Sequence, residues 1–204
     1  MPAKRKYELK RRAENQATTR QRIVEAALQL HATVGPARTT VMDIAKGAGV
    51  QRVTVYRHFP DNLALFSACS AHYRAQNPPP ETSSWEAIDD PIERLRVALR
   101  ALYAYYDQVA PMLQNVLRDA ETVPAVWRAT EPRRRYVADL RDLLARGWSV
   151  HGRQRQHLLA VLALALDFHT WKQLVRNEGV KPDDAVQMMI GLVRLCISPA
   201  GVKK

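Results

Sequence analysis

The sequence predicts an all-α fold of about nine helices. Apolar residues recur at helical spacing in most segments, and the first clear stripe is Ile23, Ala26, Ala27, Leu30 and Val34. No segment of the 204-residue sequence shows the alternation between turn signals that predicts a strand. Hydrophobic residues make up 47% of the chain and charged residues 25%, so a core of ordinary size is expected.

Local start and stop signals divide this helical pattern into elements. Gly35-Pro36 ends the first amphipathic helix. Thr39-Thr40 is a good N-cap for the next helix, and Asp43 lies at its N3 position, where a carboxylate can reach back to the cap. Asp61 is expected to cap the fourth helix. The expected helices cover about 18–34, 41–47, 51–58, 62–75, 91–109, 111–120, 128–148, 153–177 and 182–197.

Composition indicates an arm, two helical domains and a linker between them. Residues 1–17 carry six Lys or Arg and almost no apolar side chains, which predicts a basic disordered arm. A first helical domain is expected over residues 18–76. Residues 77–84, NPPPETSS, predict a linker or long turn, and residues 85–200 predict a second helical domain.

The positive charge is concentrated near the N-terminus. The chain has a formal net charge of +11 and a pI near 10.0. Residues 1–75 hold 13 Lys and Arg against 5 Asp and Glu, whereas residues 76–204 hold 18 against 15. This asymmetry is typical of a nucleic-acid-binding end joined to a different domain.

Several classes of protein are not indicated. The charged N-terminus lacks a signal peptide's apolar segment, and the run Leu158–Phe168 is too short to span a membrane. A cytoplasmic protein without a membrane partner is therefore expected. No nucleophile elbow, phosphate loop or Cys/His metal spacing occurs, so no enzyme, cofactor or metal site is predicted. Asp167 and His169 lie two apart on an expected helix and should face different ways.

Two short helices joined by a tight glycine turn follow the basic N-terminus, an arrangement typical of helix-turn-helix domains that bind DNA. Ala45 is small where the two helices cross closely, and Gly49 is free to adopt the left-handed conformation of a sharp turn. Val55 and Phe59 supply a small apolar contact that docks the second helix. Most of residues 51–58 should then face outward.

Two motifs occur in the stretch Thr19–Phe66, TRQRIVEAALQLHATVGPARTTVMDIAKGAGVQRVTVYRHFPDNLALF. Residues 39–50 carry T-T-x-x-x-I-A-x-x-A-G-V, and residues 54–59 carry T-x-Y-x-H-F. The stretch resembles the TetR family of repressors, and weaker similarity continues over residues 163–193. The resemblance implies an N-terminal three-helix DNA-binding domain, followed by a helical domain that binds a small effector and dimerises.

The resemblance also implies roles for individual residues. The helix from Gln51 to His58 should enter the major groove of double-stranded DNA. Thr40 and Tyr56 match positions that commonly contact phosphate. Gln51, Arg52 and Thr54 are placed for base edges or nearby phosphates, and Arg52 could bind guanine through two hydrogen bonds. The remaining candidates are Val53 for a thymine methyl group, Arg57 near the DNA backbone, and His58 for either a phosphate contact or a structural role.

Three positions depart from the usual family pattern. Met42 stands where arginine is frequent, and Gln51 replaces a serine-like cap. Asn62-Leu63 replaces a pair that often begins with lysine. These departures remove usual supports of DNA binding, so the basic arm is expected to compensate for them.

The aromatic residues of the second domain belong either to its core or to an effector pocket. In the pocket alternative, Tyr103, Tyr106, Trp127, Tyr136 and Trp171 partly line an apolar cavity. Its polar contacts would come from Arg100, Asp107, Asp167 and His169. By resemblance, the last two helices pair with their copies in a homodimer, which places two reading helices on a palindromic operator.

The function expected from these observations is that of a dimeric repressor. A small, largely apolar effector of unknown identity would release it from its operator. The alternative is a ligand-independent DNA-binding regulator controlled by a partner protein. A filled second domain would favour this alternative, and a cavity lined by the aromatic residues would favour the effector.

Overall fold

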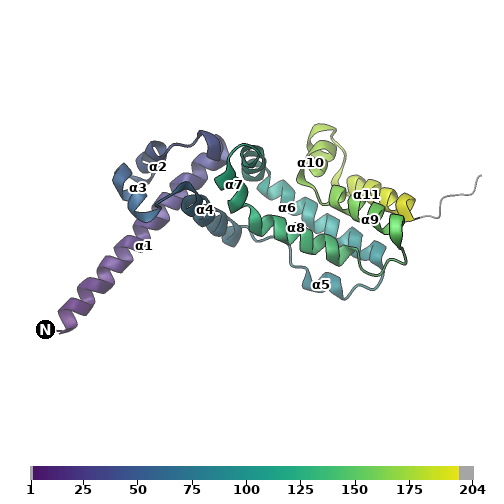
Figure 1. The fold of residues 1–204 in the computed structure, drawn as a ribbon, viewed down its shortest axis with the longest axis horizontal. Helices are drawn as coiled ribbons and strands as arrows, with labels where there is room; N and C mark the ends of the chain where they lie inside the picture. Colours follow the sequence, from purple (N-terminus) through teal and green to yellow (C-terminus); the bar gives the residue numbers. More distant parts are fainter. Residues whose placement is uncertain (1, 198–204) are drawn as a thin grey trace, which may run out of the picture. The chain divides into compact units, whose positions relative to one another are not determined.

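The computed structural model describes residues 2–197, and of residues 2–6 and 9 it describes the backbone alone. Within this range the chain forms helices and no strand, which confirms the all-α prediction (Figure 1). Eleven α-helices occur there instead of about nine, with a 3-10 turn and a π-helical segment in addition. The side chains of Lys4, Arg5 and Lys6 and the predicted domain end at 198–200 lie outside the described part.

The chain forms two compact units, and neither is continuous in sequence. The first unit combines Met1–Pro78 with Ala110–Glu131, and the second combines Pro79–Val109 with Pro132–Lys204. The predicted domains, 18–76 and 85–200, were continuous. The helix α6 (Pro91–Ala120) contributes its first part to the second unit and its last part to the first.

The first unit is built on a long helix with short helices beside it. Besides the end of α6 it contains α1 (Pro2–Thr33), η1 (Pro36–Arg38), α2 (Val41–Ala48), α3 (Arg52–His58), α4 (Asn62–Gln76) and α7 (Pro124–Ala129). Its core is formed by the apolar faces of α1 to α4 and includes Ile23, Ala27, Ile44, Phe59 and Leu65. The helix α4 also packs against α7.

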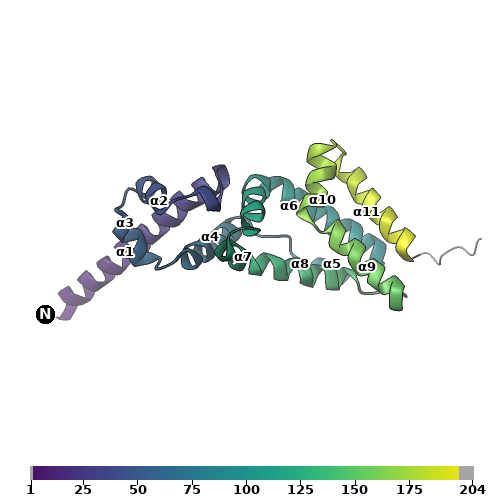
Figure 2. The ribbon, with the colours of Figure 1, turned by 45° about the horizontal axis from the view of Figure 1, so that its top comes forward.

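The second unit holds the remaining helices. They are α5 (Ser83–Glu86), the first part of α6, α8 (Glu131–Leu144), α9 (Gly152–Ala165), α10 (Phe168–Trp171), the π-helical segment η2 (Lys172–Asn177) and α11 (Pro182–Ile197). Figure 2 shows α11 beside α9, and these two helices pack against each other.

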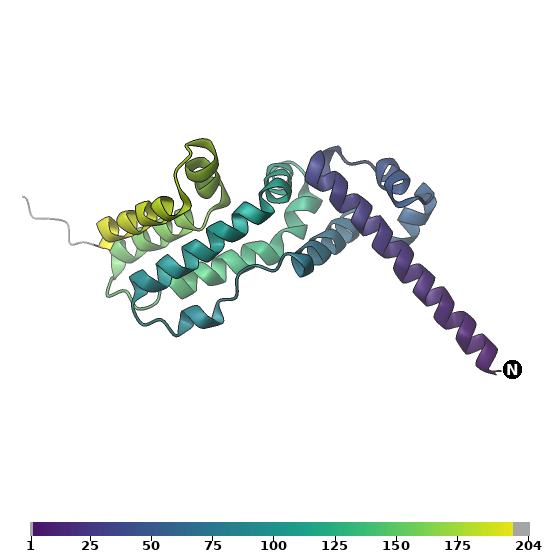
Figure 3. The same ribbon diagram turned by 180° about the vertical axis from the view of Figure 1, so that it is seen from behind.

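Residues 2–17 of the predicted disordered arm are helical. The helix α1 begins at Pro2, and its first half extends beyond α2, α3 and α4 (Figure 3). This segment is rich in Ala, Lys, Arg, Glu and Gln and has no glycine or proline after Pro2, so its helix propensity is high. Lys10 and Glu14 add an ion pair at 3.9 Å on this helix.

Four features of the helix boundaries also differ from the prediction. Pro111 lies inside α6, and Val109 before it and Met112 after it are both buried. The expected helix 128–148 is divided between α7 and α8. The expected helix 153–177 is interrupted at Asp167, and Ser83-Ser84 of the expected turn begin α5.

Within residues 2–197, no single helix is long and apolar enough to cross a membrane. By length and composition alone, α9 passes that test only together with residues 168–177, and the two parts are bent by 61°.

Candidate nucleic-acid interface

The start of α2 is fixed by a complete capping box. The Thr40 hydroxyl accepts a hydrogen bond from the Asp43 amide at 3.1 Å, and Asp43 Oδ2 accepts one from the Thr40 amide at 3.2 Å. The Thr40 hydroxyl also donates to Asp43 Oδ2 at 2.6 Å. The hydrogen bond that the Thr40 side chain donates to Asp43 has the largest effect on the pKa of Asp43, followed by that from the Thr40 amide, and both lower it. The cap predicted from the sequence is confirmed, and the hydroxyl hydrogen of Thr40 is directed at Asp43.

The turn between α2 and α3 depends on a glycine. Gly49 has φ 62° and ψ 41°, the left-handed conformation that was predicted for it. The amide of the next residue, Val50, donates to the Ala45 carbonyl at 2.9 Å, which closes the end of α2. Arg22 of α1 donates to the Ala48 carbonyl at the same end. This turn sets the angle between the two short helices.

The helix α3 is docked by very little apolar surface. Val55 is the buried residue of α3, and Phe59, directly after it, is buried as well. Both pack in the core formed with Ile44 of α2 and Ile23 of α1, as the sequence predicted. Arg20 of α1 also contacts Phe59, because its guanidinium carbon lies 4.5 Å from the centre of the Phe59 ring.

Most side chains of α3 remain accessible. Gln51, Arg52, Val53, Tyr56 and Arg57 are exposed, and Thr54 and His58 are half-buried. Gln51 precedes the first residue of the helix without making a side-chain cap, in agreement with the weak helix start that was predicted. Met42 on α2 is also exposed, at 66%. The structure therefore gathers the predicted DNA-contacting residues on the unburied surface of one helix-turn-helix unit.

Two of these candidates are in contact with each other. Arg52 Nη2 donates to the Tyr56 hydroxyl at 3.0 Å, and the Arg52 guanidinium carbon lies 5.4 Å from the centre of the Tyr56 ring. The two residues are four apart, so one turn of α3 brings them to the same side. From the sequence, the two residues were predicted to make independent contacts with DNA.

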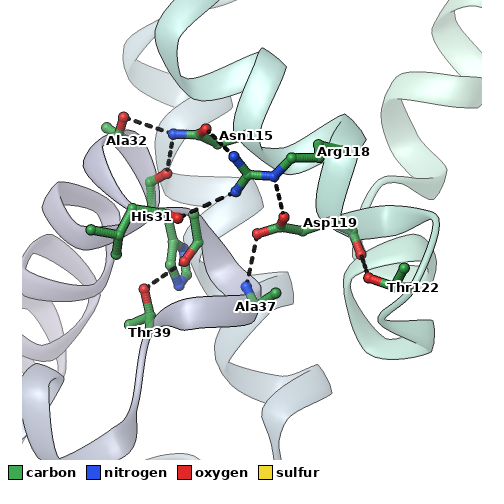
Figure 4. Close-up of polar contacts among 10 residues, drawn as sticks. His31, Ala32, Ala37, Thr39, Asn115, Arg118, Asp119 and Thr122 are labelled. Carbon is green, nitrogen blue, oxygen red and sulfur yellow. Dashed lines mark hydrogen bonds and ion pairs between the residues drawn. The ribbon is translucent and has the colours of Figure 1, made fainter.

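The loop that leads into α2 is held by three side chains of α6, Asn115, Arg118 and Asp119, which we call the α6 clamp (Figure 4). Asn115 Nδ2 donates to the carbonyls of His31 at 3.1 Å and Ala32 at 2.9 Å. Arg118 Nη2 donates to the Val34 carbonyl at 3.2 Å. The clamp thus satisfies carbonyls at the end of α1 that have no partner within the helix itself.

The third member of the clamp binds the other side of the loop. Asp119 is 4% exposed, and its Oδ2 accepts a hydrogen bond from the Ala37 amide at 2.8 Å. Its Oδ1 accepts from Arg118 Nε at 2.7 Å. Burial raises the pKa of Asp119, but these hydrogen bonds and the charges of Arg118 and Arg38 outweigh it, so the pKa is lowered overall. The carboxylate is held ionised.

A glycine allows the clamp to approach the loop. Gly35 has φ 93°, and a Cβ atom at this position would collide with Arg118 Nη2 and Asp119 Oδ2. Gly35, which was predicted to end the first helix, therefore has a second role, because a side chain at this position would have to displace Arg118 and Asp119.

His31 lies beneath the clamp. It is 3% exposed, its ring centre is 5.5 Å from that of Phe66, and its Nε2 has no hydrogen-bond partner among the described residues. Burial lowers the pKa of His31 to about 4, against the opposing effect of the nearby Asp119 charge. The imidazole is therefore neutral near pH 7. Neither His31 nor the clamp was among the predicted functional residues, because no local pattern relates two segments more than 80 positions apart.

Comparison with known proteins identifies this helix-turn-helix unit. Residues 23–69 match the family described as bacterial regulatory proteins, tetR family. A stretch of 49 residues is 47% identical to the HTH-type transcriptional regulator AcrR of Shigella flexneri. Residues 23–69 therefore form a helix-turn-helix domain of the TetR family.

The extent of these similarities differs between the two comparisons. The AcrR match covers 24% of this chain and 23% of the relative, so the chain aligns with about a quarter of that protein's length. The whole fold is similar to NalD, the secondary repressor of the MexAB-OprM multidrug efflux pump in Pseudomonas aeruginosa, with a TM-score of 0.62, 22% identity and coverage of 92% of this chain and 100% of NalD. A transcriptional regulator from Rhodococcus sp. has a TM-score of 0.58 at 19% identity, over 89% and 99% of the two chains. The TetR-like fold thus extends through both units.

In the second unit, three of the predicted pocket residues lie together. Tyr103, Tyr106 and Trp171 are each at most 1% exposed, and the Tyr106 ring centre is 5.9 Å from that of Trp171. The Tyr103 hydroxyl donates to the Ala165 carbonyl at 3.1 Å, and that of Tyr106 to the Leu166 carbonyl at 2.6 Å. Burial raises the pKa of both phenols, that of Tyr106 to about 12.

The other predicted pocket residues lie around or outside this group. Arg100 pairs with Asp183 at 2.8 Å, and Asp107 with Arg176 at 2.7 Å, and all four side chains are about half or more exposed. The hydroxyl of the half-buried Tyr136 donates to the Pro80 carbonyl at 2.9 Å. Trp127 belongs to the first unit and is 52% exposed, so it is not among the residues that the second unit brings together.

The prediction that Asp167 and His169 face different ways is wrong. His169 Nδ1 lies 3.4 Å from Asp167 Oδ1. Asp167 has extended backbone and caps α10 by accepting from the amides of His169 at 2.7 Å and Thr170 at 3.3 Å, so helical spacing does not apply to it. Among the described residues, no group of three His, Cys, Asp or Glu could hold a metal ion.

Proposed function

We propose that this chain is a homodimeric repressor that binds a palindromic operator through α3 and is released by a small, largely apolar effector. The observation that carries the proposal is the unburied surface of α3, which presents Arg52, Val53, Tyr56 and Arg57 on a helix docked by two apolar residues. The described part of the chain leaves this surface uncovered, and cations and polar groups suit phosphates and base edges. Repression is supported by the similarity of fold to NalD, which is described as a repressor.

Dimerisation is supported by exposed apolar residues on α9 and α11. Met188, Leu192 and Leu195 of α11 are spaced at four and three residues and are 48%, 38% and 75% exposed. Leu164 of α9 is 48% exposed. An apolar row on two mutually packed helices is typical of a surface that a second copy covers. Two-fold symmetry would then present two copies of α3 to the two halves of a palindrome.

Effector binding in the second unit is supported by one unsatisfied group. Trp171 is fully buried, and its Nε1 has no hydrogen-bond partner among the described residues. A buried donor without an acceptor is costly, so an effector that supplies an acceptor to this indole would stabilise the unit. The neighbouring rings of Tyr106 and Phe168 would surround the apolar part of such a compound.

One observation favours the alternative, a regulator controlled by a partner protein instead of an effector. Tyr103, Tyr106 and Phe168 are buried, and both phenol hydroxyls already donate to backbone carbonyls. These side chains behave as a packed core, which has no need of a ligand. The two alternatives therefore differ in whether Trp171 acquires an acceptor.

The helix α6 offers a physical route from effector to operator. It carries Tyr103 and Tyr106 in its first part and the α6 clamp in its last. An effector that prefers a shifted α6 would move the loop before α2 and with it the reading helix. It can shift this equilibrium only as far as its affinities for the two arrangements differ.

The proposal is tested by selecting duplexes from fragmented genomic DNA with the purified full-length protein and footprinting the enriched site. A two-fold symmetric footprint and a dimeric mass in light scattering are expected. A library of apolar compounds is then screened for thermal stabilisation and release of the duplex. A protein that enriches no duplex contradicts operator binding, and enrichment without any releasing compound favours control by a partner protein. Because the DNA is its target, a cytoplasmic location is part of the proposal.

A further inference from the structure

The contact between Arg52 and Tyr56 gives Tyr56 a role in base recognition. We propose that Tyr56 is a positioning residue that holds Arg52 in the orientation in which it reads a guanine, in addition to any phosphate contact of its own. The proposal rests on the docking of α3 in the major groove. The hydrogen bond at 3.0 Å and the guanidinium 5.4 Å from the ring centre already exist in the free chain.

Arg52 needs such a support because its side chain is long and exposed. An exposed arginine samples many rotamers, and ordering it on binding costs free energy. Among the described residues, both contacts of the Arg52 guanidinium are with Tyr56. A tyrosine has only two side-chain torsions, so a guanidinium that lies on its ring and bonds its hydroxyl is already largely ordered before DNA arrives.

The direction of the hydrogen bond leaves both residues able to bind DNA. The Tyr56 oxygen accepts from Arg52, so the phenolic hydrogen remains free to donate to a phosphate oxygen. The guanidinium has five N–H donors and uses one of them, which leaves others for the O6 and N7 atoms of a guanine. One arrangement therefore satisfies a phosphate contact and a base contact together.

The position of the pair in α3 explains why a tyrosine is needed there. Arg52 is the first residue of α3, and the preceding Gln51 makes no side-chain cap, so little fixes the start of the helix. Tyr56 lies one turn later, next to the buried Val55. The contact therefore holds the guanidinium of Arg52, at the weakly fixed start of α3, against Tyr56, which lies beside the buried Val55.

The experiment uses the full chain and the duplex enriched from fragmented genomic DNA, with each base pair of that duplex replaced in turn. The wild-type protein is expected to lose about 5- to 150-fold in affinity when the guanine read by Arg52 is replaced. Arg52→Gln should remove this discrimination. Tyr56→Phe keeps the ring and loses the hydroxyl, so it should remove part of the discrimination, and Tyr56→Ala should remove nearly all of it.

The matched control is Arg57→Gln on the exposed surface of the same helix. It should weaken binding by the same factor on every duplex and reduce the dependence on salt. Tyr56→Phe changes no charge, so its salt dependence should equal that of the wild type. Thermal unfolding of each variant checks that α3 remains folded, which is expected because Tyr56 is 44% exposed.

The proposal is overturned if Tyr56→Phe and Tyr56→Ala weaken binding equally on all duplexes and leave the discrimination unchanged, since Tyr56 would then be a phosphate contact only. It is also overturned if Arg52→Gln retains the preference at every base pair. In both cases a preferred duplex exists, so the proposed function survives. A protein that enriches no duplex overturns the proposed function and this inference with it.

Discussion

The carboxylate of Asp119 accepts a hydrogen bond from the amide of Ala37 at 2.8 Å, although 82 positions separate the two residues in the sequence. This bond joins the end of α6 to the loop that enters the helix-turn-helix. Asn115 and Arg118 hold the end of α1 in the same way. The DNA-reading unit is therefore not complete at the end of α4, because its first loop depends on side chains from residues 110–131.

Replacing Asp119 by Ala is expected to destabilise the chain and weaken operator binding. The substitution leaves the Ala37 amide and the Arg118 guanidinium without their acceptor, and one buried unsatisfied donor costs about 1–3 kcal/mol. Denaturant unfolding should show a loss of this size, and fluorescence anisotropy should show weaker binding to the operator. The control is Glu121→Ala, at an exposed position two residues after Asp119, and it should change neither the stability nor the operator affinity. Equal effects of the two substitutions would contradict the role of the clamp.

Gly35→Ala is expected to disrupt the clamp from the other side. The substitution places a methyl group against Arg118 and Asp119 and also imposes a residue other than glycine at φ 93°. Gly179→Ala separates the two causes, because Gly179 has φ 70° and its added Cβ would meet nothing within 4 Å. Thermal unfolding should show a modest loss for Gly179→Ala and a larger one for Gly35→Ala. If the two losses are equal, the collision with the clamp is unimportant.

The stability of the chain is expected to fall between about pH 6.5 and pH 4 because of His31. Its folded pKa is lowered to about 4, so the unfolded chain binds a proton in this range and the folded chain does not. The contribution of neutral His31 to stability is fully present above the unfolded pKa of 6.5 and is lost as the pH falls towards the folded pKa of about 4. A shift of this size corresponds to about 3 kcal/mol. Urea unfolding measured at steps from pH 7 to pH 4 tests it.

His31→Phe removes the titrating group and keeps an aromatic ring against Phe66. The slope of stability against pH should become shallower in this variant over the same range. His157→Gln, on an exposed position of α9, should retain the wild-type slope. A wild-type slope in His31→Phe would show that another group causes the acid sensitivity.

The features that the sequence predicted are those with local causes. The capping box of Thr40 and Asp43, the left-handed Gly49 and the burial of Val55 all follow from residues within one or two turns of one another. The helix break at Asp167 was missed although an N-cap aspartate causes it, because the apolar run on both sides of it dominates the pattern.

The features that were missed have distant causes. Asn115, Arg118 and Asp119 read as ordinary surface residues of a helix, and only the packing of α6 on the end of α1 gives them partners. The contact of Arg52 with Tyr56 has helical spacing and was in principle predictable once both residues were placed on one helix.

Leu195→Glu is expected to weaken dimerisation without unfolding the protomer. Leu195 is 75% exposed on α11, so a charge there costs the isolated chain little and costs a covered interface much more. Light scattering at a series of concentrations should show a shift towards monomer. Met42→Glu, an exposed apolar residue of the first unit, should leave the mass unchanged. A stable dimer in Leu195→Glu would indicate that another surface joins the subunits.

Deleting residues 2–12 is expected to weaken operator binding and flatten its dependence on salt. The segment carries six Lys or Arg and belongs to the part of α1 that projects beyond the other helices. Each phosphate contact contributes about −0.9 to the slope of log affinity against log salt concentration. Replacing Lys10, Arg11 and Arg12 by Gln keeps the helix and removes three charges, so it should reduce the magnitude of the slope by up to about 3. Because these side chains are exposed, thermal unfolding should change little. An unchanged slope in both variants would show that the basic segment does not touch DNA.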